Sequence, residues 1–154
     1  MEANMKKTLL IIVAAGTVLM SYLLWLTCRP VEIIAVHKKD NYSSVLVNNF
    51  PFTERGRINC WQENKQMLKN RYGVPRPDTD GFFTVIFWDF GDGYKEEGKY
   101  DRLCFDDMNP PANCIEKNKL FTVNYGRNMG LYFTTNNERY FINKDGNIIK
   151  MKDD

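Results

Sequence analysis

The hydrophobic positions of this chain form two patterns, one continuous and one interrupted. Near the N-terminus, residues 8–28 form a 21-residue run without a charged side chain, between Lys7 and Arg29. A helix of about 20 apolar residues is long enough to cross the hydrocarbon core of a bilayer. Farther along, apolar residues alternate or cluster in short segments that turn residues separate. The pattern predicts one membrane anchor followed by a folded domain.

The flanks of the apolar run favour an anchor that stays on the protein. Tyr22 and Trp25 lie near its far end, where aromatic rings favour the headgroup level, and Pro30 ends the helix. A cleavable signal peptide needs small residues before its cleavage site, and Trp25 and Thr27 before Cys28 fit that poorly. Cleavage and lipidation at Cys28 remain open as alternatives.

The orientation follows from the sizes of the two flanking parts. The tail before the run is short and carries Lys6 and Lys7, whereas the part after it is a whole domain. Long domains cross the membrane largely regardless of flanking charge. We expect residues 1–7 to be a cytoplasmic tail, residues 8–28 the transmembrane helix, and residues 29–154 a periplasmic domain at the bacterial inner membrane.

Short segments rich in β-branched and aromatic residues predict strands in this domain. They are residues 31–37, 43–50, 81–90, 99–105 and 119–125, followed by a meander over residues 131–151. Residues 81–90 contain almost no polar side chain, which predicts a central strand covered on both faces. Asn136-Asn137 and Asp145-Gly146 lie where the meander needs tight turns.

One amphipathic helix is predicted between the second and third strands. Thr53 is a good N-cap residue, and Gly73 is a typical residue just beyond a C-terminus. The expected inner face has spacings of three and four residues and consists of Ile58, Trp61, Lys65, Leu68 and Tyr72, with Arg57, Gln62, Lys69 and Arg71 mostly on the other faces. The fold class expected is α+β, one helix packed on a mainly antiparallel sheet of six or seven strands.

The four cysteines are too scattered for a zinc site. Cys104 and Cys114 flank the turn signal at residues 109–111, so that their sulfurs could meet across a short loop. In an oxidising compartment this disulfide would stabilise the fold by roughly 2–3 kcal/mol, and two reduced thiols are the alternative. We expect Cys60 to be a buried free thiol.

One acidic stretch contains the strongest candidates for a chemical site. Residues 89–107 contain seven acids and three bases, a net charge of −4. Asp89-Phe90-Gly91 matches the magnesium-binding triplet of protein kinases, but the chain contains neither the glycine-rich loop nor the catalytic loop of a kinase. Weak candidates for a cation site are Asp89, Asp92, Asp106 and Asp107. The favoured interpretation is a hairpin turn followed by a solvated edge.

Composition narrows the function classes further. The net charge is only +2 and no basic face stands out, so nucleic acid is not an expected partner. His37 is the only histidine, which excludes a histidine-rich metal site. It is expected at a surface or sheet edge. No nucleophile–base pair is evident. We therefore expect neither an enzyme nor a cofactor.

Several long strings resemble one protein family. They are WLTCRPVEIIAVH, NNFPFTERGRINCW, FWDFGDGYKEEGKYDRLCFDD and CIEKNK, and with the anchor they cover nearly the whole chain. Together they resemble an enterobacterial membrane protein family of unknown function. The resemblance implies one N-terminal anchor and a small domain in a Gram-negative cell envelope. It carries over no catalytic residues.

Two functional hypotheses follow. In the first, the domain binds another protein of the cell envelope, in an immunity-type or accessory role, through a contact patch of exposed aromatic residues. The candidates for that patch are Trp88, Phe90, Tyr94 and Tyr100. In the alternative, the acidic residues 89–107 bind a cation or small ligand in an envelope sensor or accessory subunit.

Overall fold

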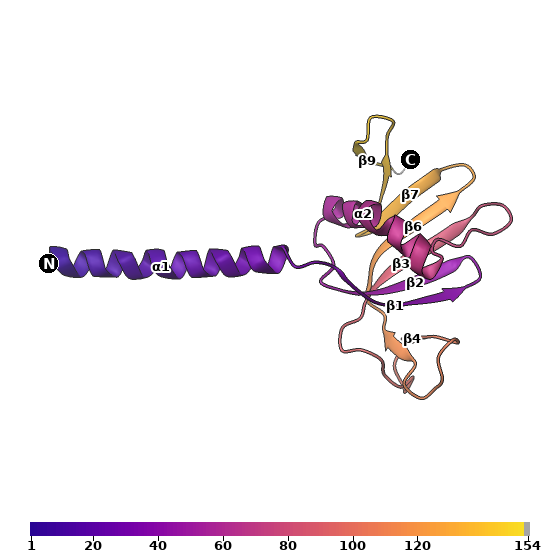
Figure 1. Ribbon diagram of the computed structural model, residues 1–154, viewed down its shortest axis with the longest axis horizontal. Coiled ribbons are helices and arrows are strands. Elements are labelled where there is room, and N and C mark those ends of the chain that lie inside the picture. Colours follow the sequence, from indigo (N-terminus) through magenta and orange to yellow (C-terminus); the bar gives the residue numbers. More distant parts are fainter. Residues whose placement is uncertain (153–154) are drawn as a thin grey trace. The chain divides into compact units, whose positions relative to one another are not determined.

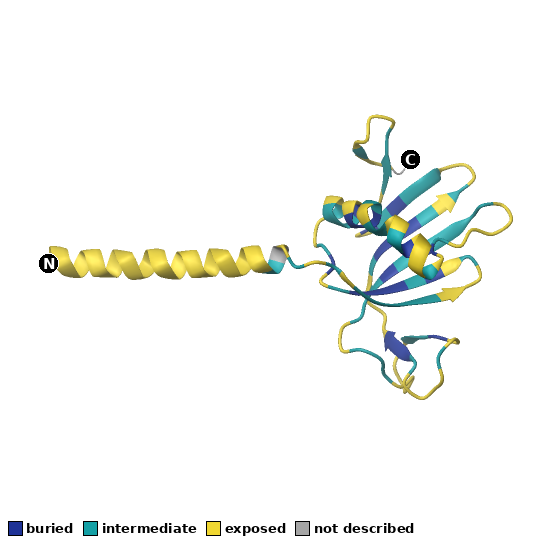
Figure 2. Cartoon of the chain, in the orientation of Figure 1, coloured by how far each residue is buried: buried dark blue, intermediate teal, exposed yellow. Residues whose placement is uncertain are grey.

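The computed structural model describes residues 1–152, apart from the side chain of Thr27, and the chain divides into two compact units, Met1–Pro30 and a second that begins at Val31. The first unit is the helix α1 (Glu2–Thr27), which is long and apolar enough to cross a membrane. Its side chains are exposed from Glu2 to Trp25 (Figure 2). The helix begins at Glu2, so the expected tail of residues 1–7 is part of it, and it ends before Pro30 as predicted.

The second unit confirms the α+β class. Its elements are β1 (Glu32–Lys39), β2 (Tyr42–Asn48), α2 (Glu54–Tyr72), β3 (Phe83–Asp89), β4 (Arg102–Cys104), β5 (Cys114–Glu116), β6 (Lys119–Gly126), β7 (Gly130–Thr135), β8 (Glu138–Ile142) and β9 (Ile148–Lys150). Seven strands form the main sheet in the order β1-β2-β3-β6-β7-β8-β9, and β4 pairs only with β5. Figure 1 shows α2 lying across one face of the main sheet.

The main sheet is antiparallel except at one pair. β2 and β3 run parallel because α2 connects them, and parallel neighbours need a crossover of this kind. The predicted meander is confirmed, with β6, β7, β8 and β9 pairing in sequence. Asn136 and Asn137 have φ angles of 50° and 63°, and Gly146 has a φ of 80°, as tight hairpin turns require.

The α2 helix begins and ends where its sequence predicts. The Thr53 side chain accepts a hydrogen bond from the Gly56 N–H at 3.0 Å, and Gly73 adopts a left-handed conformation with a φ of 67°. The buried residues of the helix are Ile58, Cys60, Trp61 and Leu68. Lys65, which was expected on this inner face, is exposed, because a charged ammonium group is costly to bury without a partner.

Arg57 also departs from the prediction, since it points inward from the first turn of α2. Its Nη1 donates to the Leu120 carbonyl and to Thr135 Oγ1, both at 2.6 Å, and its Nε donates to the Pro51 carbonyl at 2.8 Å. A guanidinium offers several donors in a planar fork, so it can satisfy acceptors from three segments at once. Burial lowers the pKa of this guanidinium.

Alternate residues of β2 and β3 serve two different cores. Val45 and Val85 face α2 in the main core, whereas the fully buried Leu46 faces the other side of the sheet. There it packs against Phe105 and Ile115, which belong to the segment of residues 90–118 between β3 and β6, called the insertion below. Figure 1 shows the insertion, with β4, on the side of β1.

The insertion corrects two expectations about the sheet. The strand predicted over residues 99–105 lies outside the main sheet, as β4, because β3 pairs directly with β6 and leaves no room between them. β3 is central, as predicted, but only one of its faces is fully covered. Ile86 and Trp88, on the face toward the insertion, are only half-buried.

Candidate functional site

A disulfide closes the insertion. Cys104 and Cys114 are directly opposite one another in the β4–β5 pair and are bonded as predicted. Cys114 is completely buried and precedes Ile115 of the smaller core, whereas Cys104 is half-buried. Cys60 is a buried free thiol, as predicted, and burial, which is the main cause, raises its pKa to about 11.

The side chain of His37, on β1, binds two residues of the insertion. His37 Nδ1 lies 2.8 Å from an Asp107 carboxylate oxygen, and Nε2 lies 2.8 Å from the Tyr94 hydroxyl. Its ring stacks on Phe105 with the centroids 3.9 Å apart. β1 is an edge strand, as expected for His37, and the His37 side chain is only 10% exposed. The partners lie 57 and 70 residues away in sequence, which local patterns cannot connect.

The Asp107–His37–Tyr94 arrangement does not favour nucleophilic chemistry. Burial, and secondarily the charge of Asp107, raise the pKa of the Tyr94 hydroxyl, so this group keeps its proton at neutral pH. An activated nucleophile needs the opposite shift or a base that is free to take its proton. The contacts of His37 are better explained as hydrogen bonds that hold the insertion in one position.

The four aspartates suggested as weak cation ligands do not come together. Asp89 accepts hydrogen bonds from the Gly91 N–H and the Asn118 amide, and the other three carboxylates pair separately: Asp92 with Lys95, Asp106 with Lys39, and Asp107 with His37. Within residues 1–152, no group of three or more His, Cys, Asp or Glu side chains is placed to hold a metal ion. The structure therefore adds no support to a cation site.

The turn after β3 is present, but it does not form a hairpin. Gly91 and Gly93 have φ angles of 51° and 91°, which favour glycine. The chain then leaves the main sheet, and the Phe90 N–H donates to the Val47 carbonyl at 3.0 Å. The predicted hairpin is corrected to a turn that leads into the insertion.

The expected aromatic contact patch is mostly part of the smaller core. Trp88, Phe90 and Tyr94 are half-buried and pack against the cluster of Leu46, Phe105 and Ile115. Tyr100 is the exception, with 71% of its surface exposed. Exposure of the first three was therefore predicted wrongly, because the sequence does not reveal that the insertion folds back over them.

The surface of the insertion is acidic. Its seven acidic and four basic residues give a net charge of −3. Lys95 and Arg102 both bind Glu116, and these two bonds, Arg102 first, lower the pKa of that carboxyl. Glu96 and Glu97 are exposed and have no ion-pair partner among the residues that the structure describes.

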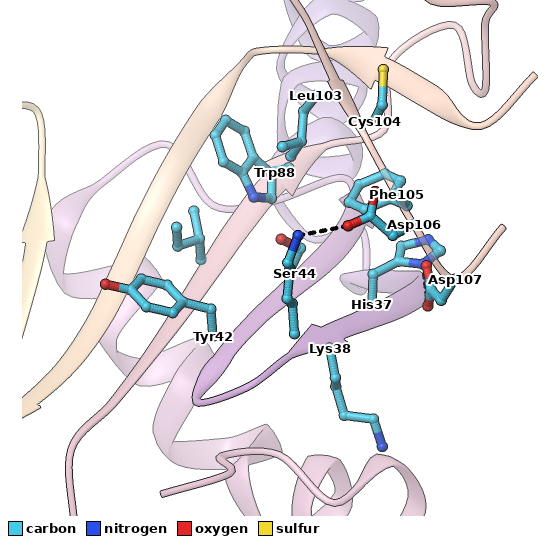
Figure 3. Close-up of a pocket in the computed structure, with 12 residues that line it drawn as sticks. His37, Lys38, Tyr42, Ser44, Trp88, Leu103, Cys104, Phe105, Asp106 and Asp107 are labelled. Atoms are coloured by element: carbon cyan, nitrogen blue, oxygen red, sulfur yellow. Dashed lines mark hydrogen bonds and ion pairs between the residues drawn. The ribbon is translucent and has the colours of Figure 1, made fainter. Parts of the chain in front are cut away.

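A cavity of about 590 Å³ lies where the insertion leaves part of the sheet uncovered. Figure 3 shows Tyr42, Ser44 and Trp88 lining it from the sheet, while Leu103 and Phe105 line it from the insertion. The Trp88 indole nitrogen is buried and has no hydrogen-bond partner within the described part of the chain. Volumes of this size are typical of small-ligand sites. Sequence reasoning missed this cavity, because its walls come from segments that are distant along the chain.

Comparison with known proteins identifies the family without assigning an activity. Neither a curated protein nor a solved structure matches the chain. A family model described as "Enterobacterial putative membrane protein" matches residues 2–152, which is nearly the whole chain and confirms the resemblance seen in the sequence. The apolar helix α1 and the domain that follows both lie within this match. The chain belongs to the enterobacterial putative membrane protein family.

Proposed function

We propose that this protein is a single-pass protein of the bacterial inner membrane whose domain lies in the periplasm and binds another envelope protein, in an immunity-type or accessory role. In this arrangement residues 1–7 are cytoplasmic, residues 8–28 cross the membrane, and the domain begins near residue 29. The family membership and the exposed apolar helix support the anchor. The Cys104–Cys114 disulfide supports the periplasm, because disulfides persist in oxidising compartments and are rare in the cytosol.

The observation that supports a partner is the way the insertion is built. It is held by a disulfide, by the His37 contacts and by aromatic packing, yet its outer surface presents Tyr100, Glu96 and Glu97 to solvent. A preorganised surface loses little conformational entropy on binding, and exposed tyrosines are common binding hot spots. The acidic surroundings favour a partner with a basic contact surface.

The proposed role is binding rather than catalysis. The one histidine is occupied by the insertion on both ring nitrogens, and the Tyr94 hydroxyl beside it stays protonated. The disulfide and the aromatic packing of the insertion stabilise its structure. No observation among the described residues favours the alternative of a cation sensor, because the carboxylates that would carry it have separate partners.

Single cysteines added on the two sides of the anchor test the location. Both variants carry Cys28→Ala, which removes the exposed native thiol. One adds Lys99→Cys at an exposed position of the insertion, and the other adds Lys6→Cys before the apolar run. We expect a membrane-impermeant maleimide to label the cysteine at position 99 in intact cells and the cysteine at position 6 only after lysis. The reverse pattern would place the domain in the cytoplasm and would remove the proposal.

A photocrosslinking amino acid at position 100 tests the partner. We expect a discrete adduct in living cells from position 100 and none from the matched position Tyr125, an exposed tyrosine of β6 outside the insertion. Reversing charge with Glu96→Lys and Glu97→Lys should abolish the adduct. An adduct that persists after charge reversal, or that forms equally from position 125, contradicts a partner bound at this surface.

A further inference from the structure

The cavity beside the insertion has the size and partial enclosure of a ligand site. Its volume is about 590 Å³, and small-molecule sites occupy roughly 300–1,000 Å³. One wall is the face of β1–β3 that α2 leaves free, and the other is residues 103–107 of the insertion (Figure 3). Tyr100, Glu96 and Glu97 do not line it, so this cavity is separate from the surface proposed for the protein partner.

The inner part of the cavity is apolar and aromatic. Trp88 and Ile86 come from β3, and Leu103 and Phe105 face them from the insertion. The disulfide and the His37 contacts hold the insertion in place, so this space is preformed. Flat aromatic rings fill such spaces well, because they bury a large apolar area and stack on other rings.

The cavity offers hydrogen-bond donors beside the carboxylates of Asp106 and Asp107. The Trp88 indole N–H is buried without an acceptor among the described residues, and the half-buried Ser44 adds a hydroxyl to the lining. Lys39, whose side chain is largely exposed, adds a positive charge at the rim. Lys39 and Ser44 are the donors that the cavity offers to a ligand, so a ligand that brings an acceptor is favoured over one that brings only donors.

The charges at the rim can rearrange to admit an anion. Lys39 Nζ contacts Asp106 at 2.6 Å, but their side chains are 76% and 78% exposed, and such solvent-exposed pairs are weak. A carboxylate entering the cavity can therefore take the place of Asp106 on Lys39. Asp107, the other acid at the rim, is already held by His37.

From these contacts we propose that the cavity binds an aromatic carboxylate, with the ring against Trp88 and Phe105 and the carboxylate on Lys39 and Ser44. Two sources share this chemistry, a free aromatic acid and the C-terminal aromatic residue of a peptide. The proposal goes beyond the partner-binding role and does not depend on it.

The test uses the full-length protein in detergent micelles, with ¹⁵N in its three tryptophans. Indole-3-acetate is the probe, and tryptamine, which has the same ring and the opposite charge, is its control. Trp88 reports on the cavity, while Trp61 in the main core and Trp25 in α1 report on general perturbation and on entry of the probe into the micelle. We expect a saturable shift of the Trp88 indole N–H signal with indole-3-acetate alone.

Two neighbouring lysines provide matched variants. Lys39→Gln removes the cation at the cavity and should weaken binding about tenfold, as the loss of one charge-assisted hydrogen bond implies. Lys38 also borders the cavity, but its side chain points away from Ser44 and Asp106 (Figure 3), and its Nζ donates to the Tyr72 carbonyl on the other side of the sheet. Lys38→Gln should therefore leave the affinity unchanged. The peptide Gly-Gly-Trp with a free carboxylate then distinguishes a peptide end from a free acid.

Several results would overturn the proposal. They are a Trp88 signal that moves with neither probe, equal or tighter binding of tryptamine, a Trp88 shift no larger than that of Trp25, and equal affinities of the Lys38→Gln and Lys39→Gln proteins. None of these results bears on crosslinking from position 100. Failure of the ligand site is therefore distinguishable from failure of the partner role.

Discussion

Removing the disulfide of the insertion gives the sharpest test of how this domain is held together. The change is Cys104→Ala with Cys114→Ala in the full-length protein. The two cysteines are 10 residues apart in sequence, and closing a loop of this length lowers the entropy of the unfolded chain enough to stabilise the fold by roughly 2.5–3 kcal/mol. Alanine is preferred to serine because Cys114 is fully buried, where an unpaired hydroxyl would add a cost of its own.

The loss should lower stability without unfolding the domain. Leu46, Phe105 and Ile115 still pack together in the double variant, and the main core lies on the other face of the sheet. For a domain of this size, a loss of roughly 2.5–3 kcal/mol corresponds to a fall in Tm of about 10 °C. Urea unfolding in detergent, followed by tryptophan fluorescence, measures the free energy of unfolding directly.

Reduction supplies the matched control. Wild-type protein unfolded in the presence of a reductant should lose about as much stability as the double variant, and the reductant should not affect the double variant. Cys28→Ala, at an exposed free thiol, should leave stability unchanged. A loss below about 1 kcal/mol in the double variant would refute the reasoning, because it would mean that the unfolded chain gains little freedom from the open loop.

Three further predictions concern α2 and its ends. Arg57→Lys keeps the charge but not the planar fork, and should cost about 2–3 kcal/mol in urea unfolding because buried acceptors lose their donor. Gly73→Ala should cost about 1 kcal/mol in the same assay, since the φ of 67° is unfavourable for a residue with a Cβ. Cys60 keeps its proton in the fold up to a pKa of about 11, whereas the unfolded chain loses it at lower pH. Stability should therefore fall by about 1–2 kcal/mol more in wild type than in Cys60→Ala as the pH rises from 9 to 11, and a parallel decline in both proteins would contradict this.

The features that local sequence specifies were predicted well. The Thr53 cap, the Gly73 end of α2 and the tight turns of the meander each depend on a few neighbouring residues. The disulfide could also be predicted, because Cys104 and Cys114 flank a short turn-rich segment. The main strands followed from their apolar and β-branched composition.

The features that depend on distant partners were missed. Arg57 looked like a solvent residue because nothing in the helix pattern reveals the carbonyl of Leu120 beneath it. His37 was expected at a surface or sheet edge, but its partners were missed because Asp107 and Tyr94 reach it only after the insertion folds back. The cavity could not be predicted for the same reason, since it exists only between the sheet and the insertion.

The position of the insertion has a consequence for how this family can diversify. β3 and β6 are direct antiparallel neighbours, with Phe87 opposite Phe121, although 29 residues separate the end of one from the start of the other. A short turn would suffice to join such strands. The main sheet therefore does not need the insertion to connect β3 to β6, but Leu46 of β2 needs Phe105 and Ile115 to cover it. The insertion and the sheet face beneath it form one packing unit, so Leu46, Phe105 and Ile115 should vary together among relatives.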